Sequence, residues 1–296
     1  MLSILIPIYN YDVRGFVRQL LDQAEQVGFE VEIRCLDDAS EASFKELNAE
    51  IGQWRGVVLD YAETNLGRSK ARNTLVHGAL FEHLLFLDCD GACLDDSYLA
   101  KYAKVWNKYD VVYGGRVYSE EAPDDHDLYF HWYVGSNREA IDSEQRLLNP
   151  YKSFMTNNFL IRKSVFNAIK MDETLVGYGH EDTLFAQELK RAGFQINHID
   201  NPIMHCGLES FHEFFRKSEN GIRNLGTLIE RNQVDDSIRL VRYYNHLKKW
   251  SLLGPISSIV QTFEERLKAN LKGPAPNLLW FDLWKLSKLR EFSKNR

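Results

Sequence analysis

The sequence is poor in the features that mark extracellular and membrane-spanning proteins. Its four cysteines are too few and too scattered for a disulfide framework or a four-thiolate zinc site. No uninterrupted apolar run approaches the roughly 20 residues that span a bilayer, and the longest candidate, 252–260, is broken by Gly254 and Pro255. The first residues carry no basic leader and reach Pro7 too soon for a signal peptide. These absences predict a soluble protein of a reducing compartment.

The composition is that of an ordinary globular chain. Its 296 residues are 44% hydrophobic and 26% charged, which excludes a disordered or fibrous protein. The formal net charge of -6 hides an asymmetry. Residues 241–296 hold 11 Lys and Arg against 4 Asp and Glu, or +7, so the first 240 residues carry -6 - 7 = -13. A basic end on an acidic body suggests a separate surface with an anionic partner.

The first two thirds of the chain alternate β-rich and helix-periodic segments. This alternation predicts an α/β fold with a mostly parallel sheet covered by helices on both faces. Residues 119–150 exceed an ordinary connection and form either a functional loop or a small inserted element. From Ser210 onward the pattern is helical. Strands are expected at 3–6, 31–36, 57–59, 84–87, 110–113, 158–161 and 194–198, and helices at about 13–26, 43–51, 69–80, 96–107 and 181–192.

Polar residues follow the carboxyl ends of several expected strands, where ligands bind in sheets of this kind. Asp37 and Asp38 follow one strand, and Asp88 and Asp90 follow the apolar run 84–87. Carboxylate oxygens suit Mg²⁺ or Mn²⁺, which complete their shell with phosphate oxygens. A helix cap at Asp37 and Asp38 and a solvated turn at Asp88 and Asp90 are the plainer alternatives. The convergence of these strand ends at one edge favours a ligand site.

Four short segments contain these polar residues. They are Ser3-Ile4-Leu5-Ile6-Pro7-Ile8-Tyr9-Asn10, Asp37-Asp38-Ala39-Ser40, Asn65-Leu66-Gly67-Arg68-Ser69-Lys70-Ala71-Arg72-Asn73 and Leu87-Asp88-Cys89-Asp90-Gly91. In order and spacing this set resembles the successive motifs of family 2 glycosyltransferases. The resemblance covers about residues 1–210, and 177–182 resembles the Gly-x-Gly-x-Glu-Asp stretch of this and related families. It implies a GT-A fold, a nucleotide-sugar donor, a divalent metal ion (Mn²⁺ or Mg²⁺) and inversion at the anomeric carbon.

We expect a GT-A catalytic domain at 1–209 and a helical C-terminal extension at 210–296. Within the catalytic domain, 1–116 would be the nucleotide-binding half and 117–209 the acceptor half. Carried over position by position, the resemblance assigns Asp90 as the direct metal ligand, Asp88 to the ribose or the metal, and His205 to the completion of the metal site. An isolated histidine is more often structural, and that alternative stays open for His205. The resemblance assigns the nucleoside and donor pocket to Pro7, Tyr9, Asn10, Asp38, Asn65, Arg72 and Asp88.

The resemblance also assigns the acceptor side. Transfer needs a base for the acceptor hydroxyl; Asp182 resembles the base of the family, and Glu181 would contact an acceptor hydroxyl. Charge at a helix N-terminus is the alternative for Asp182. The remaining acceptor residues would be the glycine loop Gly177, Tyr178 and Gly179, whose backbone approaches the sugar, and Trp132, an aromatic platform whose commoner fate is core packing.

The basic C-terminal segment has two interpretations of equal weight. Its Trp, Leu and basic residues fit a helix lying on an anionic membrane surface. Because apolar and basic positions do not separate cleanly on a helical projection, packing against the catalytic domain or a second subunit is the alternative. The residues concerned are Leu240, Val241, Tyr244 and Leu247, then Leu278-Leu279-Trp280-Phe281, Leu283-Trp284, Lys285, Lys288 and Arg290.

Together these features predict an inverting, metal-dependent glycosyltransferase of the hexosyl type. It would move a sugar from a nucleotide sugar, with UDP favoured, to a saccharide or lipid-linked saccharide in surface polysaccharide or glycolipid synthesis. We expect a cytoplasmic enzyme with peripheral attachment to the inner face of the cytoplasmic membrane, or a homodimer, and no nucleic acid partner.

Two other functions stay open. A nucleotidyltransferase that makes sugar nucleotides is disfavoured, because Pro7-Ile8-Tyr9-Asn10 stands where that class carries a glycine-rich basic loop. A non-catalytic nucleotide-sugar binding or scaffold protein is disfavoured by the presence of Asp90 and Asp182.

Overall fold

A computed structural model describes residues 1–175 and 177–294, which fall into two compact units. Unit 1 comprises Met1–Ser119, Ala140–Leu175 and Glu181–Gly207, and unit 2 comprises Glu120–Glu139, Val176–His180 and Leu208–Arg296. The chain therefore passes between the units several times before Leu208. Segments 120–139 and 176–180, which the sequence placed in the acceptor half, group with the C-terminal helices.

Two sheets organise unit 1. The strands are β1 (Leu2–Ile8), β2 (Val31–Asp37), β3 (Val57–Tyr61), β4 (His83–Leu87), β5 (Gly91–Cys93), β6 (Val111–Tyr113), β7 (Arg116–Val117), β8 (Asn158–Arg162), β9 (Ile196–His198) and β10 (Ile203–His205). Seven of them form the main sheet in the order β3-β2-β1-β4-β8-β6-β9. In this sheet β8 is antiparallel to both neighbours, and the other pairs are parallel. The second sheet has the order β5-β10-β7.

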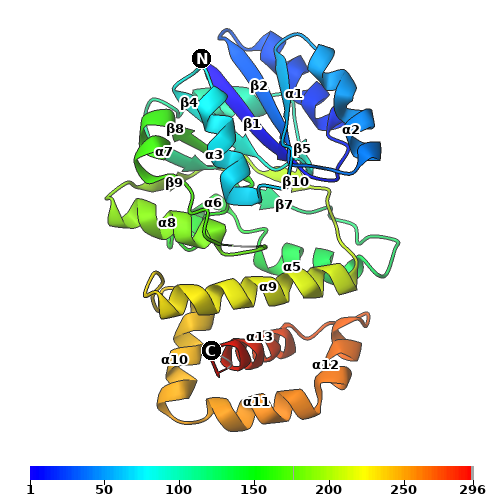
Figure 1. The fold of residues 1–296 in the computed structure, drawn as a ribbon, viewed down its shortest axis with the longest axis vertical. Coiled ribbons are helices and arrows are strands. Elements are labelled where there is room, and N and C mark those ends of the chain that lie inside the picture. The colour runs from blue at the N-terminus through cyan, green and yellow to red at the C-terminus, as the bar shows by residue number, and fades with distance from the viewer. Residues whose placement is uncertain (176, 295–296) are drawn as a thin grey trace. The chain divides into compact units, whose positions relative to one another are not determined.

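Helices cover both faces of the main sheet (Figure 1). Side chains alternate between the faces of β1, so Ile4 and Ile6 join one buried cluster with Phe16 and Tyr98, while Leu5 joins another with Phe185. The helices of unit 1 are α1 (Arg14–Gln26), α2 (Ala42–Asn48), the 3-10 helix η1 (Ala49–Gln53), α3 (Arg68–Gly78), α4 (Tyr98–Ala103), α6 (Ser143–Leu147), α7 (Lys163–Ile169) and α8 (Glu181–Arg191).

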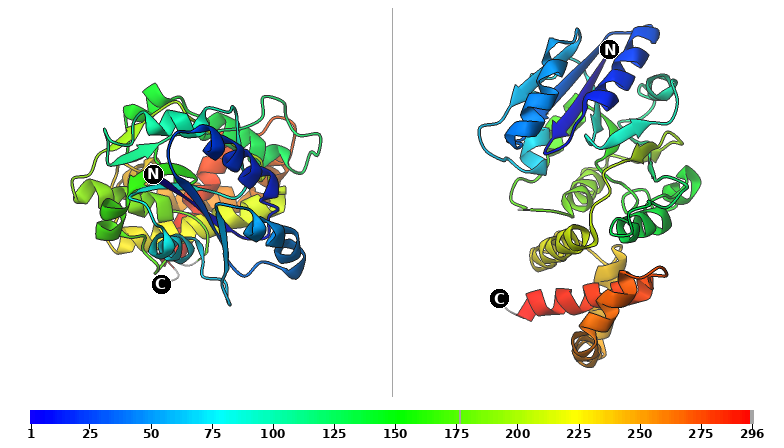
Figure 2. Two further views of the ribbon diagram at one scale, coloured as in Figure 1. Left: turned by 90° about the horizontal axis from the view of Figure 1, so that it is seen from above. Right: turned by 90° about the vertical axis from the view of Figure 1, so that its right-hand side faces the viewer.

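Unit 2 is helical in its described residues. Its helices are α5 (Tyr129–Arg138), α9 (Phe211–Glu230), α10 (Arg239–Lys249), α11 (Leu253–Thr262), α12 (Glu264–Leu271) and α13 (Leu278–Lys294), and Figure 2 shows α9 to α13 in yellow to red from two further sides. Its core joins Phe130 of α5 to Phe214 of α9 and to Phe281 and Trp284 of α13. Segment 119–150 thus holds α5 and α6 as inserted elements.

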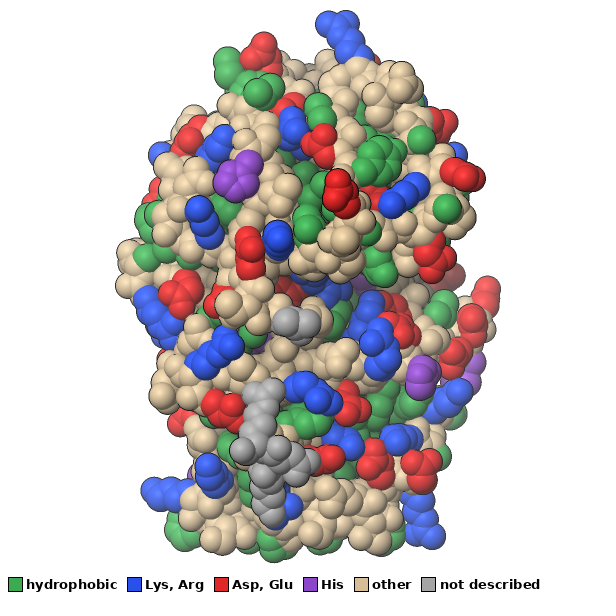
Figure 3. Space-filling view, viewed as in Figure 1, with side chains coloured by type: hydrophobic (Ala, Val, Ile, Leu, Met, Phe, Trp, Pro, Cys, Tyr) green, Lys and Arg blue, Asp and Glu red, His purple; other side chains and the backbone are tan. Residues whose placement is uncertain are grey.

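The apolar residues of α13 serve the core of unit 2. Phe281, Trp284, Leu286 and Leu289 are all buried, and for these residues the structure shows packing. Asp282 on the same helix lies within ion-pair distance of Arg138, Arg239 and Lys285, which ties α5 and α10 to α13. Among the described residues no helix is long and apolar enough to cross a membrane. On the face drawn in Figure 3, acidic and basic side chains are interspersed.

Candidate active site

Backbone turns after β1 and β2 are joined by side-chain hydrogen bonds. The Asn10 amide donates to Ser40 Oγ at 2.9 Å, and Asn10 Oδ1 accepts from the Glu41 amide at 2.8 Å. Asn10 has a positive φ of 48°, a conformation that asparagine tolerates better than most residues. Pro7 lies within β1, paired with Leu36, whereas the side chain of Tyr9 is exposed beyond the end of the strand.

Asp38, just past β2, holds the loop that enters α3. Its two carboxylate oxygens accept backbone N–H bonds from Leu66 (2.5 Å) and Gly67 (3.0 Å), while Asn65 Nδ2 donates to its carbonyl at 3.0 Å. Burial raises the pKa of Asp38, and the two N–H bonds oppose that shift. The carboxylate therefore fixes the backbone of the loop that leads into α3. Asp37, which the sequence analysis placed with Asp38 at the ligand edge or as a helix cap, is fully buried, and its Oδ1 accepts a hydrogen bond from the Ser40 amide.

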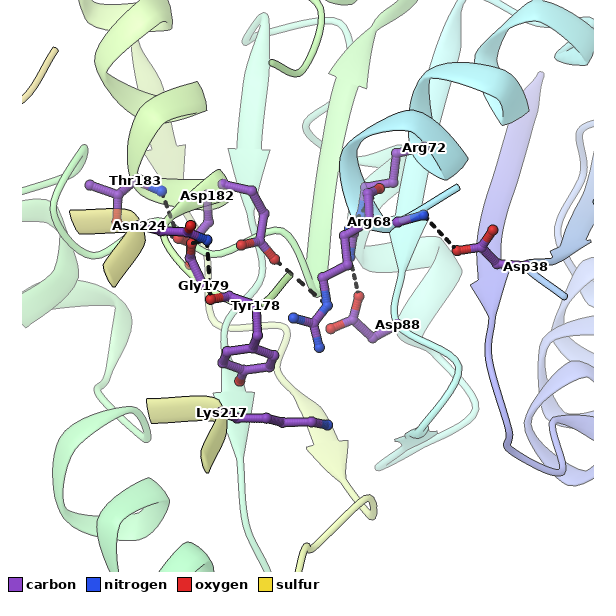
Figure 4. A network of polar contacts seen from close by, with 12 residues as sticks. Asp38, Arg68, Arg72, Asp88, Tyr178, Gly179, Asp182, Thr183, Lys217 and Asn224 are labelled. Carbon is purple, nitrogen blue, oxygen red and sulfur yellow. Dashed lines mark hydrogen bonds and ion pairs between the residues drawn. The ribbon is translucent and has the colours of Figure 1, made fainter. Parts of the chain in front are cut away.

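Asp88 lies between two arginines. Arg72 Nη2 on α3 is 2.5 Å from Asp88 Oδ1 (Figure 4), and Arg116 Nη2 on β7 is 3.6 Å from Oδ2. Both guanidinium groups are mostly buried, and guanidinium does not lose its proton in proteins. The two guanidinium groups beside Asp88 present planar sets of N–H donors, which suit an anionic ligand such as a diphosphate.

Arg116 is a residue that sequence reasoning missed. It lies three positions past the end of β6, as Asp90 lies three positions past the end of β4. The rule that singled out Asp90, a charged residue at the carboxyl end of a strand, therefore also points to Arg116. The two-residue strand β7 pairs with β10 and fixes its position.

Asp90 and His205 come together through the small sheet. β10 pairs antiparallel with β5 so that His205 faces Gly91, and the Cys206 amide donates to the Asp90 carbonyl at 2.8 Å. His205 Nδ1 is then 3.4 Å from Asp90 Oδ2. Burial alone would raise the pKa of Asp90, but hydrogen bonding and charge from His205 and the charge of Arg116 hold it below its usual range. Asp90 is thus ionised at neutral pH.

The donor atoms at Asp90 and His205 fit a divalent cation of the Mn²⁺ or Mg²⁺ type. A carboxylate oxygen and an imidazole nitrogen are ligands that such ions accept, with phosphate and water completing the shell. Gly207 leaves room there, since a Cβ at this position would lie 2.3 Å from Asp90 Oδ2. No set of three or more His, Cys, Asp or Glu side chains in the described chain is arranged to hold a metal.

Glu181 and Asp182 begin α8. Glu181 Oε1 lies 3.7 Å from Arg68 Nε, which brings the start of α8 to the start of α3. Asp182 Oδ1 accepts the Thr183 amide at 2.6 Å, so the carboxylate is held at the helix N-terminus (Figure 4). Sequence reasoning also missed Arg68. Its ion pair with Glu181 joins α3 to α8 within unit 1.

The four acceptor residues expected from the sequence belong to unit 2. Gly177 and Gly179 have φ values of 83° and 96°, and a Cβ on Gly179 would lie 2.9 Å from the Cα of Gly221. Asn224 Nδ2 donates to the carbonyls of Tyr178 and Gly179 at 3.3 and 3.1 Å. The close packing of Gly179 on α9 therefore accounts for a glycine at this position without any contact to a sugar. Trp132 lies on α5, its ring 5.5 Å from that of Tyr129.

Comparison with known proteins shows the family of the chain and the fold that it shares with solved structures. Residues 3–170 match the family model of "Glycosyl transferase family 2". Among solved structures, TarS of S. aureus (residues 1–349) is 17% identical with a TM-score of 0.52, covering 99% of this chain and 90% of that one. The mannosyltransferase PcManGT of Pyrobaculum calidifontis, solved with GDP-Man and Mn²⁺, is 13% identical with a TM-score of 0.60, covering 99% and 86%. No curated protein matches the chain.

Proposed function

Since the chain belongs to glycosyl transferase family 2, and has the expected GT-A fold with C-terminal helices, we propose that this glycosyltransferase is an inverting, metal-dependent enzyme of the hexosyl type. Its donor would be a nucleotide sugar, with UDP favoured, and its acceptor a saccharide or lipid-linked saccharide of a surface polysaccharide or glycolipid. TarS has been solved with UDP and with UDP-GlcNAc, and PcManGT with GDP-Man. The observation that carries the proposal is the pairing of Asp90 with His205 beside the arginine-flanked Asp88.

The donor would lie at the carboxyl edge of the main sheet. Asp90 and His205 would hold the cation, which when bound neutralises charge on the departing diphosphate. Arg72 and Arg116 add fixed positive charge. This charge stabilises the leaving group more strongly as that group gains negative charge. Asp88 orients both guanidinium groups and could accept from a ribose hydroxyl. Pro7, Tyr9, Asn10, Asp38 and Asn65 would form the nucleoside side.

Inversion requires attack from the side opposite the leaving group. The acceptor oxygen forms a bond to the anomeric carbon as the bond from that carbon to the diphosphate oxygen breaks. Asp182 takes the proton of the acceptor hydroxyl, and the electron pair of the broken bond leaves with the nucleoside diphosphate. Glu181, already near Arg68, would accept from a second acceptor hydroxyl. Gly177, Tyr178, Gly179 and Trp132 stay proposals for acceptor binding.

Thermal unfolding with UDP tests the donor site. A ligand at about 100 times its Kd stabilises by about 2.7 kcal/mol, a rise of about 5 °C or more for a chain of this size. We expect that rise with Mn²⁺ but not with EDTA, and expect Asp90→Asn to remove it. Asp110→Asn is the matched control, because Asp110 precedes β6 at the opposite end of its strand. A rise that survives EDTA would refute the metal assignment.

The same assay separates binding from chemistry. Asp182→Asn should keep the UDP-dependent rise and lower turnover of the cognate sugar by about 10² to 10⁴-fold, the usual contribution of a general base. If the Asp182→Asn variant turned over as fast as the wild type, Asp182 would not be the base. Screening nucleotide sugars for metal-dependent hydrolysis would identify the donor.

A further inference from the structure

One side of α11 is buried, and a second apolar row, on the helix and at its two ends, is largely exposed. Leu253, Ser257 and Val260 are buried, and Ser257 Oγ lies 2.8 Å from Ser287 Oγ of α13. A second row, Leu252, Ile256, Ile259 and Phe263, has the spacing i, i+4, i+7, i+11. Ile256 and Ile259 lie in α11, and Leu252 and Phe263 flank the helix at its two ends. Ile256 is partly buried against the core of unit 2. The exposed fractions are 49% for Leu252, 60% for Ile259 and 48% for Phe263. We call this row the α11 stripe.

Basic residues border the α11 stripe. Trp250, 63% exposed, precedes it, and Lys248 and Lys249 end α10 directly before that tryptophan. Residues 237–263 contain Arg239, Arg242, Lys248 and Lys249 and no Asp or Glu. Arg239 is paired with Asp282, while Arg242, Lys248 and Lys249 are exposed. Figure 3 shows hydrophobic and basic side chains along its lower edge, where Figure 1 places α11.

We propose that the α11 stripe, with Trp250, Lys248 and Lys249, docks unit 2 on an anionic lipid bilayer. An apolar row that enters the headgroup region, with a tryptophan at its margin and lysines facing anionic lipid, has the chemistry of a helix lying in a membrane interface. Charge favours an anionic bilayer over a second copy of the chain on this surface. A second copy would bring its own Lys248 and Lys249 toward the same two lysines. The nearest following carboxylates, Glu264 and Glu265, both lie within ion-pair distance of Lys268.

This surface differs from the one that the composition of the C-terminus suggested. The aromatic and leucine residues of α13 include Phe281, Trp284 and Leu289 of the core, so deleting α13 would unfold unit 2 and say nothing about lipid. Leu252, Ile259 and Phe263 of the α11 stripe are exposed and can be changed singly. The proposal is independent of the catalytic assignment, because vesicle binding is measured without turnover.

Cosedimentation of the full chain with vesicles tests the proposal. We expect binding to vesicles of phosphatidylcholine that contain about 30 mol% of the anionic lipid phosphatidylglycerol. Binding to vesicles of phosphatidylcholine alone should be weak. Ile259→Ser with Phe263→Ser should lower the partition coefficient at least about tenfold, since each loses a large apolar side chain. Lys248→Gln with Lys249→Gln should lower it and reduce its dependence on salt. Leu148→Ser, an exposed leucine of unit 1, is the matched control and should bind as the wild type does.

Three results would overturn the proposal. The first is equal binding of wild type and the Ile259→Ser, Phe263→Ser variant, with circular dichroism showing both folded. The second is equal binding of the wild type to neutral and anionic vesicles. The third is a wild-type dimer in sedimentation equilibrium that the same variant converts to monomer without any effect on lipid binding, which would assign the α11 stripe to a second copy. The lysine pair supplies an independent answer if the apolar variant fails to fold.

Discussion

His198 occupies a buried position in unit 1 with both ring nitrogens engaged. Arg146 Nε lies 3.3 Å from Nδ1, and Nε2 lies 3.0 Å from the Pro150 carbonyl. Because arginine can only donate, Nδ1 accepts and Nε2 carries the single proton. Burial lowers the pKa of His198 to about 4, and the positive charge of Arg146 adds to the shift, against the hydrogen bond to Pro150.

This histidine predicts a pH dependence of stability. An unfolded histidine has a pKa of about 6.5, so between about pH 6.5 and pH 4 the unfolded chain binds a proton that the native chain does not. The free energy of unfolding should therefore fall as pH falls through that range, by up to about 1.4 kcal/mol per unit, and this contribution should end near pH 4. Urea unfolding of wild type and His198→Gln at several pH values measures it as a difference.

The variant carries its own control. His77→Gln changes an exposed histidine of α3 and should leave the pH profile parallel to that of the wild type. If the pH profile of His198→Gln is also parallel to that of the wild type, His198 does not cause the loss of stability. The lowered pKa of its buried imidazole would then be wrong.

At the same scale, the sequence predicted the acidic groups of the site better than their partners. Asp88 and Asp90 follow a strongly apolar strand and could be found from that pattern. The pairing of Asp88 with Arg116 could not, because Arg116 reaches it through β7, whose two residues have no periodicity of their own. Tertiary pairing, which no local pattern encodes, decides where that guanidinium lies.

Among elements, the main sheet follows directly from the sequence. β1, β2 and β4 are long apolar or alternating runs, and their expected positions agree with the structure to within one or two residues. The expected helix at 96–107 is only six residues long, as α4. The small sheet went unpredicted, since β5 and β10 have three residues each and take their conformation from one another.

The small sheet gives Gly207 a task that can be tested. Because a Cβ there would lie 2.3 Å from Asp90 Oδ2, Gly207→Ala must displace the carboxylate or the backbone after β10. We expect it to weaken Mn²⁺ affinity by about 10 to 100-fold, the usual effect of disturbing the residues that support a metal ligand. Titration of Mn²⁺ against the UDP-dependent rise in melting temperature measures this.

Gly15→Ala is the matched change on a different element. No atom lies within 4 Å of a Cβ at Gly15, in the first turn of α1, so this variant should keep its Mn²⁺ affinity and gain about 0.5–1 kcal/mol of stability. Equal Mn²⁺ affinity in Gly207→Ala and wild type would show that Asp90 needs no space beside it.

For the whole molecule, the expected domain boundary after residue 209 can be tested, because unit 2 also includes residues before that point. Phe130 and Val134, from the segment before that point, join the core of unit 2 with Phe214 and Phe281. A chain ending at 209 would leave these two side chains without the rest of that core. We expect it to bind a hydrophobic dye and to melt below the full chain.

The comparison needs one further variant. Phe130→Ser with Val134→Ser in the shortened chain should reduce dye binding if the exposed core of unit 2 causes it. A shortened chain that melts as the full one does, without dye binding, would support residues 1–209 as an independent domain.

The position of β10 in the chain has a consequence for synthesis. Asp90 leaves the ribosome early, with the strands around it, but β5 can pair with β10 only after residues 203–205 have been made. During translation the first hundred residues thus already contain the aspartates of the nucleotide half while His205 is still absent. A nascent chain, or one cut short by a premature stop codon before that strand, would lack the Asp90–His205 pair, so the proposed donor site would be complete only after His205 has been made.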